Sequence, residues 1–172
     1  MADTLFLIAA SGLVGDNDAQ LVAGDVAATF ETHIGRPAMS FDDTAEEAAT
    51  SPEYECPESY GGGTLKATLH LSAQATTGGV VMDVFVEAKT PGTDTIDMSD
   101  TASWDSANST GDIDFAGTTA GDPVSATVTL TNKDGMAAGD AVRIGVRRDT
   151  DHANDDLSGD VFLYSVRIWE DA

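Results

Sequence analysis

The clearest feature of the chain is a series of short segments in which apolar and polar residues alternate. Alternation with a period of two is typical of a β-strand that has one buried and one solvated face. In residues 65–71, for example, leucine and alanine alternate with Lys66, Thr68 and His70. The same pattern is seen in residues 80–86, 124–130, 141–148 and 161–169. We therefore predict five well-defined strands in the body of the chain.

The spacing of these segments predicts how the strands are connected. Residues 65–71 and 80–86 are separated by turn-forming residues 76–79, so we expect a β-hairpin or an adjacent strand pair. In the last segment, Phe162, Tyr164, Val166 and Ile168 are expected to share one face. With further strands near the N-terminus and within residues 25–41, seven or eight strands are expected. The predicted fold class is an all-β, antiparallel β-sandwich of jelly-roll type.

Residues 1–24 precede this alternating body and are interpreted separately. They contain one apolar run, made up of Leu5, Phe6, Leu7 and Ile8. The run is too short to span a bilayer, and no basic residue precedes it, so neither a transmembrane segment nor a signal peptide is expected. We interpret residues 1–24 as an N-terminal arm or strand that anchors on the body or on a neighbour. Residues 25–172 are predicted to form a single jelly-roll-like domain.

The least regular region, residues 90–122, is rich in Asp, Ser, Thr and Gly. Because it is long for a plain connection, we expect it to cross between sheets. Its large apolar residues are expected to hold it against the core; these are Ile96, Met98, Trp104 and Phe115.

The net charge of the chain limits its possible partners. Thirty Asp and Glu residues oppose eight Lys and Arg residues, which gives a formal net charge of −22. Phosphate binding needs clustered Lys and Arg, so we expect no nucleic-acid partner and no anionic membrane partner. At about 1 M salt the Debye length is about 3 Å, and self-repulsion of an acidic fold fades. The abundance of Asp suggests a halophilic or marine host; an ordinary acidic surface or a basic partner are the alternatives.

Nothing in the sequence predicts catalysis. The three histidines, His33, His70 and His152, are not part of a recognisable triad or nucleophile elbow. Neighbouring acids should raise the pKa of the single cysteine, Cys56, which favours a buried structural thiol over a nucleophile. We therefore predict that the protein is not an enzyme, with a hydrolase as the least favoured alternative.

One acidic loop carries several possible oxygen ligands for a metal ion, namely Asp149, Asp151, Asp155 and Asp156. Carboxylate oxygens are the ligands that Ca²⁺ and Mg²⁺ prefer. The spacing does not fit an EF-hand, because Ala153 and Asn154 stand where a ligand and a glycine are needed. A solvated acidic loop is favoured, with a Ca²⁺ or Mg²⁺ ion as the alternative, and no other cofactor is expected.

Several short motifs occur in order between Ser40 and the C-terminus. They are residues 51–54, 60–65, 88–92, 104–107, 130–140, 142–144, 147–149 and 157–161. This arrangement resembles a recurrent group of accessory virion proteins of phages and other tailed viruses. The resemblance covers about three quarters of the chain. It implies a jelly-roll-like fold and a place in a virus particle, and it implies no catalytic residues.

The resemblance, the small single domain and the apolar N-terminal run together predict a viral structural protein on the virion surface. We expect a capsid decoration, cement or turret component that binds the major capsid protein or neighbouring decoration subunits. A homo-oligomer is expected, with a trimer favoured. Arginine pairs well with carboxylates across interfaces. The predicted interface residues are therefore Leu5, Phe6, Leu7, Ile8, Arg143, Arg147, Arg148 and Arg167.

The alternative function is a receptor- or carbohydrate-binding module of a virus tail, neck or spike. Tyr54, Tyr60 and Trp104 lie in predicted loops, where an aromatic ring can stack against a sugar.

Overall fold

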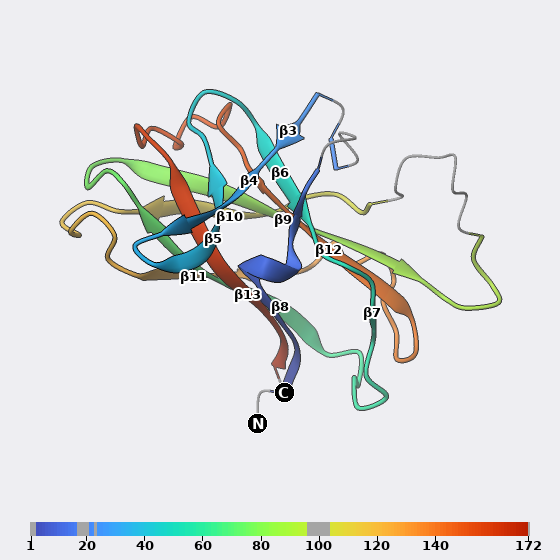
Figure 1. Cartoon of the computed structure of the whole chain (residues 1–172). Coiled ribbons are helices and arrows are strands. Elements are labelled where there is room, and N and C mark those ends of the chain that lie inside the picture. The colour runs from blue at the N-terminus through green and yellow to red at the C-terminus, as the bar shows by residue number, and fades with distance from the viewer. Residues whose placement is uncertain (1–2, 17–20, 23, 96–103, 172) are drawn as a thin grey trace.

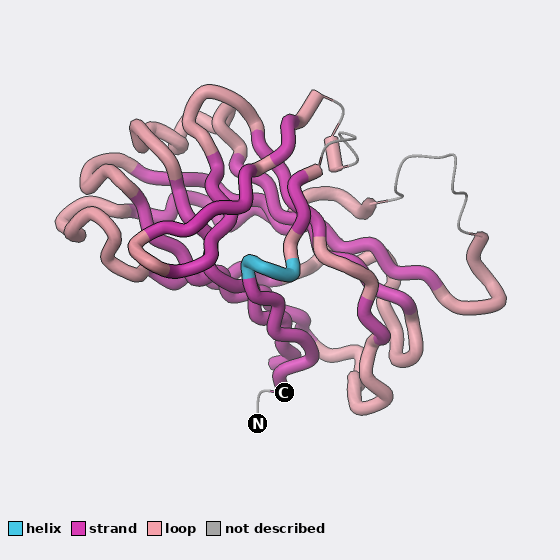
Figure 2. Tube along the Cα trace, in the orientation of Figure 1, coloured by secondary structure: helices cyan, strands magenta, loops and turns pink. Residues whose placement is uncertain are grey.

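The chain folds as a β-sandwich with almost no helix. The computed structural model describes residues 3–16, 21–22, 24–95 and 104–171. Within these residues there are thirteen strands and one short 3₁₀ turn, η1 (Ala10–Gly12), as Figure 2 shows. The strands form two sheets in which nearly all neighbours are antiparallel. The predicted all-β, jelly-roll-like sandwich is therefore confirmed. The expected number of seven or eight strands is too low, because several of the strands are only two residues long and leave no alternation in the sequence.

Sheet A contains six strands, in the order β11–β8–β13–β5–β4, with β1 also paired to β13. These strands are β1 (Asp3–Ala9), β4 (Thr29–His33), β5 (Arg36–Phe41), β8 (Thr64–Ala73), β11 (Val124–Thr129) and β13 (Val161–Asp171). The start of β13 pairs with β5 and the rest of β13 pairs with β1. The start of β1 and the end of β13 therefore lie side by side at one end of the molecule (Figure 1).

Sheet B contains seven strands, in the order β10–β9–β12–β6–β2, with β3 paired to β6 and β7 paired to β12. These strands are β2 (Val14–Gly15), β3 (Val26–Ala27), β6 (Glu47–Thr50), β7 (Tyr54–Glu55), β9 (Gly79–Lys89), β10 (Asn108–Asp114) and β12 (Ala141–Arg148). The longest pairing in this sheet, between β12 and β9, runs the whole length of β12.

The expected hairpin of residues 65–71 and 80–86 is not formed. β8 pairs with β11 and β13 in sheet A, whereas β9 pairs with β10 and β12 in sheet B. The turn at residues 76–79 therefore leads from one sheet to the other. Both strands turn their apolar residues toward the shared core, such as Leu69 of β8 and Val84 of β9. Two strands that face each other across a core show the same alternation as two strands that pair edge to edge.

The expected apolar face of residues 161–169 is broken by a β-bulge. The register of β13 against β8 shifts between Leu163 and Ser165, because a bulge sets two residues opposite one. Val161 and Leu163 point into the core before the bulge, and Val166 and Ile168 do so after it. Phe162 therefore lies on the outward side of sheet A instead of sharing the core face.

The core lies between the two sheets and includes the N-terminal strand. Phe6 and Ile8 of β1 belong to the main buried cluster. Residues 90–122 return to pair with β9 through β10 and then lead into β11 of sheet A. In that region Phe115 is buried, while Ile96 and Met98 lie outside the described residues. In the described part of the chain, no helix has the length and apolar character needed to cross a membrane.

Candidate functional site

Each sheet has an outward face, and the chain itself covers the outward face of sheet B. The outward side chains in the middle of β9, Val81, Asp83 and Phe85, are at most 3% exposed. Leu21, which precedes β3, packs with Phe85, and Trp104, which precedes β10, packs against the same cluster. Little of this face is therefore open to a ligand.

Arg147 lies on this covered face among four carboxylates. Its guanidinium nitrogens lie 2.7 Å from Asp83, 3.3 Å from Glu46 and 3.6 Å from Asp25. The fourth carboxylate, Asp149, is 3.9 Å away. Burial raises the pKa of Asp25 above its usual value, because desolvation outweighs the attraction of Arg147. Arg147 is only 8% exposed, so its predicted role at a subunit interface does not fit its position.

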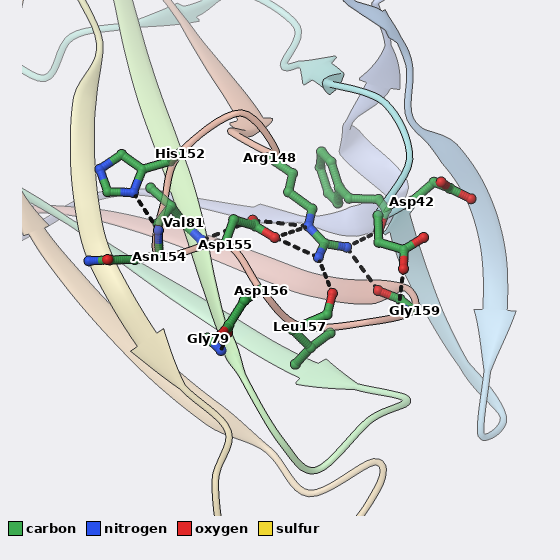
Figure 3. Close-up of polar contacts among 12 residues, drawn as sticks. Asp42, Gly79, Val81, Arg148, His152, Asn154, Asp155, Asp156, Leu157 and Gly159 are labelled. Carbon is green, nitrogen blue, oxygen red and sulfur yellow. Dashed lines mark hydrogen bonds and ion pairs between the residues drawn. The ribbon is translucent and has the colours of Figure 1, made fainter.

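Arg148 is fully buried and holds the acidic loop against the end of β12 (Figure 3). Its guanidinium donates hydrogen bonds to both carboxylate oxygens of Asp155. It also donates to the backbone carbonyls of Phe41, Leu157 and Gly159. A buried ion pair needs such additional hydrogen bonds to offset the loss of hydration. The prediction of Arg148 as an interface residue is wrong, because no part of the side chain reaches the surface.

These contacts also occupy the oxygen atoms that a metal ion would need. Asp155 accepts a further hydrogen bond from the N–H of Val81, and Asp156 accepts one from the N–H of Gly79 (Figure 3). Of the other two candidate ligands, Asp149 lies 3.9 Å from the guanidinium of Arg147, and Asp151 is exposed. Among the described residues, no group of three or more His, Cys, Asp or Glu side chains is arranged to hold a metal ion. Binding of a Ca²⁺ or Mg²⁺ ion by this loop stays a prediction, and the described residues provide no set of ligands for it.

The three aromatic residues that were expected to stack on a sugar pack against other parts of the chain instead of forming one exposed surface. Tyr60 is only 5% exposed. Tyr54 is half-buried, with its ring centroid 5.4 Å from that of Phe6. Trp104 belongs to the cover of sheet B, and the Arg143 guanidinium lies 4.8 Å from its ring. Tyr60 is therefore unavailable to a ligand, and Trp104 serves packing.

The apolar N-terminal run is divided between the core and the surface. Phe6 and Ile8 are 7% and 1% exposed, whereas Leu7 between them is 68% exposed. Leu5 is partly buried against the core. Because β1 pairs with β13 along most of its length, this segment is a strand of the sandwich. Phe6 and Ile8 are consequently unavailable as interface residues.

The outer face of sheet A is open and forms a regular array. Four neighbouring strands, β11, β8, β13 and β1, place outward side chains in register. The three rows are Thr129, Lys66, Trp169 and Thr4; then Thr127, Thr68, Arg167 and Leu7; then Ser125, His70, Ser165 and Ala9. None of these twelve residues is buried. We call them the β8–β13 face.

Hydrogen bonds between strands hold several of these side chains in place. Trp169 Nε1 donates to Thr68 Oγ1 over 3.1 Å, and that oxygen lies 2.9 Å from Thr127 Oγ1. His70 Nδ1 lies 2.8 Å from Ser125 Oγ. Such cross-strand pairs stabilise a sheet. Side chains that are already ordered also lose less conformational entropy when a ligand binds.

Trp169 is a partly exposed aromatic residue in the first row of this array. Two cations lie against its ring, with Lys66 Nζ 5.1 Å and Arg167 Cζ 5.4 Å from the ring centroid. Lys66 is ion-paired with Asp171. Arg167 Nε donates to Thr4 Oγ1 over 2.8 Å. Between Arg167 and the carboxylates of the described ranges there is no ion pair.

The β8–β13 face also differs from the rest of the molecule in charge. None of its twelve residues is Asp or Glu, although the chain has thirty of them. The next outward position on β13 is Asp171, which is ion-paired with Lys66, so acidic side chains are absent from the three rows but adjoin them. We therefore regard this face as the candidate functional site.

Part of this site could have been found in the sequence. The alternation in residues 65–71 places Lys66, Thr68 and His70 on the polar side of their strand, as the structure has them. Arg167 and Trp169 alternate with apolar Val166 and Ile168 in the same way. Trp169 was not predicted as a site residue, because a tryptophan in an alternating strand resembles a core residue.

A shallow hollow of about 430 Å³ adjoins one end of the β8–β13 face. It is lined by Gly62, Gly63, Thr64, Leu65, Thr129, Leu130, Thr131 and Lys133. Thr129 belongs both to the hollow and to the first row of the face. A long ligand that follows this row can therefore extend into the hollow.

The single cysteine, Cys56, lies outside this site and is buried. Burial, together with the negative charges of three nearby carboxylates, raises the pKa of its thiol to about 11. The thiol is therefore protonated at neutral pH, as expected of a structural cysteine.

Comparisons with known proteins identify a fold. No protein-family model and no curated protein matches the sequence. Among solved structures, the xylan-binding module CBM15 matches with a TM-score of 0.54 at 14% identity, over 99% of this chain and 96% of that one. A carbohydrate-binding module specific for non-crystalline cellulose, CBM28, matches with a TM-score of 0.52 at 13% identity, over 94% and 89% of the two chains. The resemblance to virion proteins, the trimer and the virion location stay predictions, and what is shown is the β-sandwich fold shared with these carbohydrate-binding modules.

Proposed function

We propose that this chain is a carbohydrate-binding domain that holds a glycan on the β8–β13 face and performs no catalysis. Two structures with the same fold are, by their names, modules that bind xylan and cellulose. The observation that carries the proposal is the partly exposed indole of Trp169, set among rows of hydroxyl side chains on an open sheet face.

The residue types on this face match the chemistry of a sugar. A pyranose ring has apolar C–H surfaces and a rim of hydroxyl groups, so a sugar site combines aromatic surface with hydrogen-bonding side chains. Trp169 supplies the aromatic surface, and Thr68 fixes the position of its ring through Nε1. Thr4, Thr127 and Thr129 are exposed residues with hydroxyl groups on the same face.

The shape of the face favours a polymer over a small sugar. Neighbouring strands lie about 4.8 Å apart, so a chain that crosses β11, β8 and β13 meets side chains in regular succession. An open face contacts one side of such a chain and leaves both of its ends free. This geometry suits an internal segment of a polysaccharide.

Affinity electrophoresis in gels that contain soluble polysaccharides tests the proposal. The panel would include xylan, a soluble cellulose derivative and acidic polysaccharides. We expect at least one of them to retard the native protein and to lose this effect with Trp169→Ala. Phe30→Ala is the matched control, because Phe30 is an aromatic residue 51% exposed on β4, outside the site.

Two results would contradict the proposal. One is that no polysaccharide retards the folded protein. The other is that Trp169→Ala binds as well as the native protein while its thermal unfolding is unchanged. Release of reducing ends from the bound polysaccharide by the purified protein would contradict the non-catalytic part.

A further inference from the structure

We infer that the glycan bound by the β8–β13 face carries carboxylate groups, as uronic acids do, and that Arg167 recognises them. This inference rests on the proposed carbohydrate-binding function and adds the chemical class of the sugar to it.

Arg167 has unused hydrogen-bond donors. A guanidinium group has five N–H donors in one plane. Arg167 uses Nε to bind Thr4 Oγ1. Its two terminal amino groups form no hydrogen bond or ion pair with the residues that the structure describes. They present the planar pair of donors that binds a carboxylate through both of its oxygens.

The three arginines of sheet B differ from Arg167 because each has a carboxylate partner. Arg143 is ion-paired with Glu87, Arg147 with Asp83 and Arg148 with Asp155. Most Lys and Arg residues in so acidic a chain have a carboxylate partner nearby. Arg167 has no carboxylate partner among the described residues. It lies in the middle row of the β8–β13 face, with β8 on one side of its strand and β1 on the other.

No acidic side chain of this face opposes an anionic ligand. All twelve residues of the β8–β13 face are neutral or basic. A second cation near the Trp169 ring, Lys66, is already ion-paired with Asp171. The positive charge available to a ligand is therefore concentrated at Arg167, next to the aromatic ring on which a sugar would stack.

The net charge of −22 acts against any polyanion at a distance. This repulsion is screened in molar salt, where the Debye length is about 3 Å, whereas a direct contact with Arg167 is screened less. Binding should therefore be measured in about 1 M KCl, so that the contact and not the overall charge decides the result.

Ligand pairs that differ only in charge give the sharpest test. Polygalacturonate is compared with its methyl ester, and glucuronic-acid-substituted xylan with its carboxyl-reduced form, by isothermal titration calorimetry. We expect the acidic member of at least one pair to bind about tenfold more tightly than the neutral member, as is typical of a charge-assisted hydrogen-bonded pair. Arg167→Gln should remove this difference in affinity between the acidic and the neutral member.

Two further variants control for charge and for location. Arg167→Lys keeps the charge but not the planar pair of donors, so it should restore only part of the preference. Arg36→Gln removes an exposed arginine of β5 that lies outside the face and should leave the preference unchanged.

The outcomes separate this inference from the proposed function. Equal binding of the neutral and acidic members, unchanged by Arg167→Gln, would overturn the inference and leave carbohydrate binding intact. Preference for a sulfated glucan over every carboxylated ligand would overturn the assignment of a carboxylate. Absence of binding to every glycan would overturn both. Tighter binding of the acidic member that depends on Arg167 and not on Arg36 would support the inference.

Discussion

At the scale of single residues, two buried arginines hold the outward face of sheet B and the acidic loop in place through ion pairs. Arg147 and Arg148 are neighbours in β12, and their side chains point to opposite sides of sheet B. Arg147 helps to close the outward face, and Arg148 fixes the acidic loop from inside. The acidic loop and the outward face of sheet B are therefore held by contacts within the chain, whereas the residues of the β8–β13 face are not buried.

Replacement of Arg148 tests this structural role. Arg148→Met leaves the carboxylate of Asp155 buried without a cationic partner, since its side chain is only 2% exposed. Loss of one partner of a buried pair costs about 3–5 kcal/mol of unfolding free energy, measurable by urea denaturation. The exposed Arg36→Met is the control, and Asp155→Asn added to Arg148→Met should recover part of the loss. A loss below about 1 kcal/mol is typical of surface pairs and would contradict the buried network.

The raised pKa of Asp25 predicts the direction of a pH effect. The folded chain retains the proton of Asp25 at pH values where the unfolded chain has lost it. The stability contributed by this proton is complete below the unfolded pKa of about 3.9 and is lost as the pH rises through the folded pKa. Asp25→Asn should therefore gain stability relative to the native protein as the pH rises from about 4 to neutrality. Urea midpoints across this range measure the difference, and a gain on acidification would contradict it.

At the scale of elements, alternation locates strands but does not identify their partners. β8, β9, β11, β12 and β13 all coincide with alternating segments of the sequence. Alternation marks which side of a strand is buried, so it could not show that β8 and β9 belong to opposite sheets. Nor could it reveal the bulge before Ser165. Only the fold shows that Leu21 covers sheet B above Gly145, where a Cβ atom would collide with the leucine.

The same limits explain how much of the site was predictable. Polar positions such as Lys66 and Thr68 follow from alternation within one strand. The β8–β13 face as a whole depends on four strands that are far apart in sequence, and on the closure of the opposite sheet. These are tertiary contacts, and they cannot be predicted from the pattern of residues along one segment.

The position of β1 in the sandwich predicts a difference between two adjacent apolar residues. Ile8→Ala removes a side chain that is 1% exposed and should cost about 2–5 kcal/mol of unfolding free energy. Leu7→Ala changes a side chain that is 68% exposed and should cost less than about 0.5 kcal/mol. Chemical denaturation of the two variants compares them directly. Equal, small effects would mean that residues 5–8 form a free arm.

At the scale of the whole molecule, the net charge of −22 predicts a dependence of stability on salt. Self-repulsion of the compact state is strong in dilute buffer and is screened when the Debye length falls to about 3 Å near 1 M salt. The melting temperature should therefore rise as KCl is increased from millimolar to molar concentrations. Differential scanning calorimetry measures this rise. A flat or falling curve would remove the argument for a saline environment and would leave the proposed binding site untouched.

The two tryptophans of the chain report on the two sheets. Trp169 lies on the open face of sheet A, and Trp104 lies in the cover of sheet B. Each indole N–H gives one resonance in a ¹⁵N–¹H spectrum, which Trp169→Phe and Trp104→Phe would assign. The two resonances can therefore be followed in one sample.

The most direct test of the central claim is to titrate the labelled protein with the polysaccharide that retards it in electrophoresis. We expect the Trp169 resonance to shift with ligand concentration, because its N–H is bonded to Thr68 within the β8–β13 face. The Trp104 resonance should stay in place. A shift of Trp104 alone would contradict the account and place the ligand on sheet B, and no shift of either resonance at saturation would show that the β8–β13 face is not the binding site.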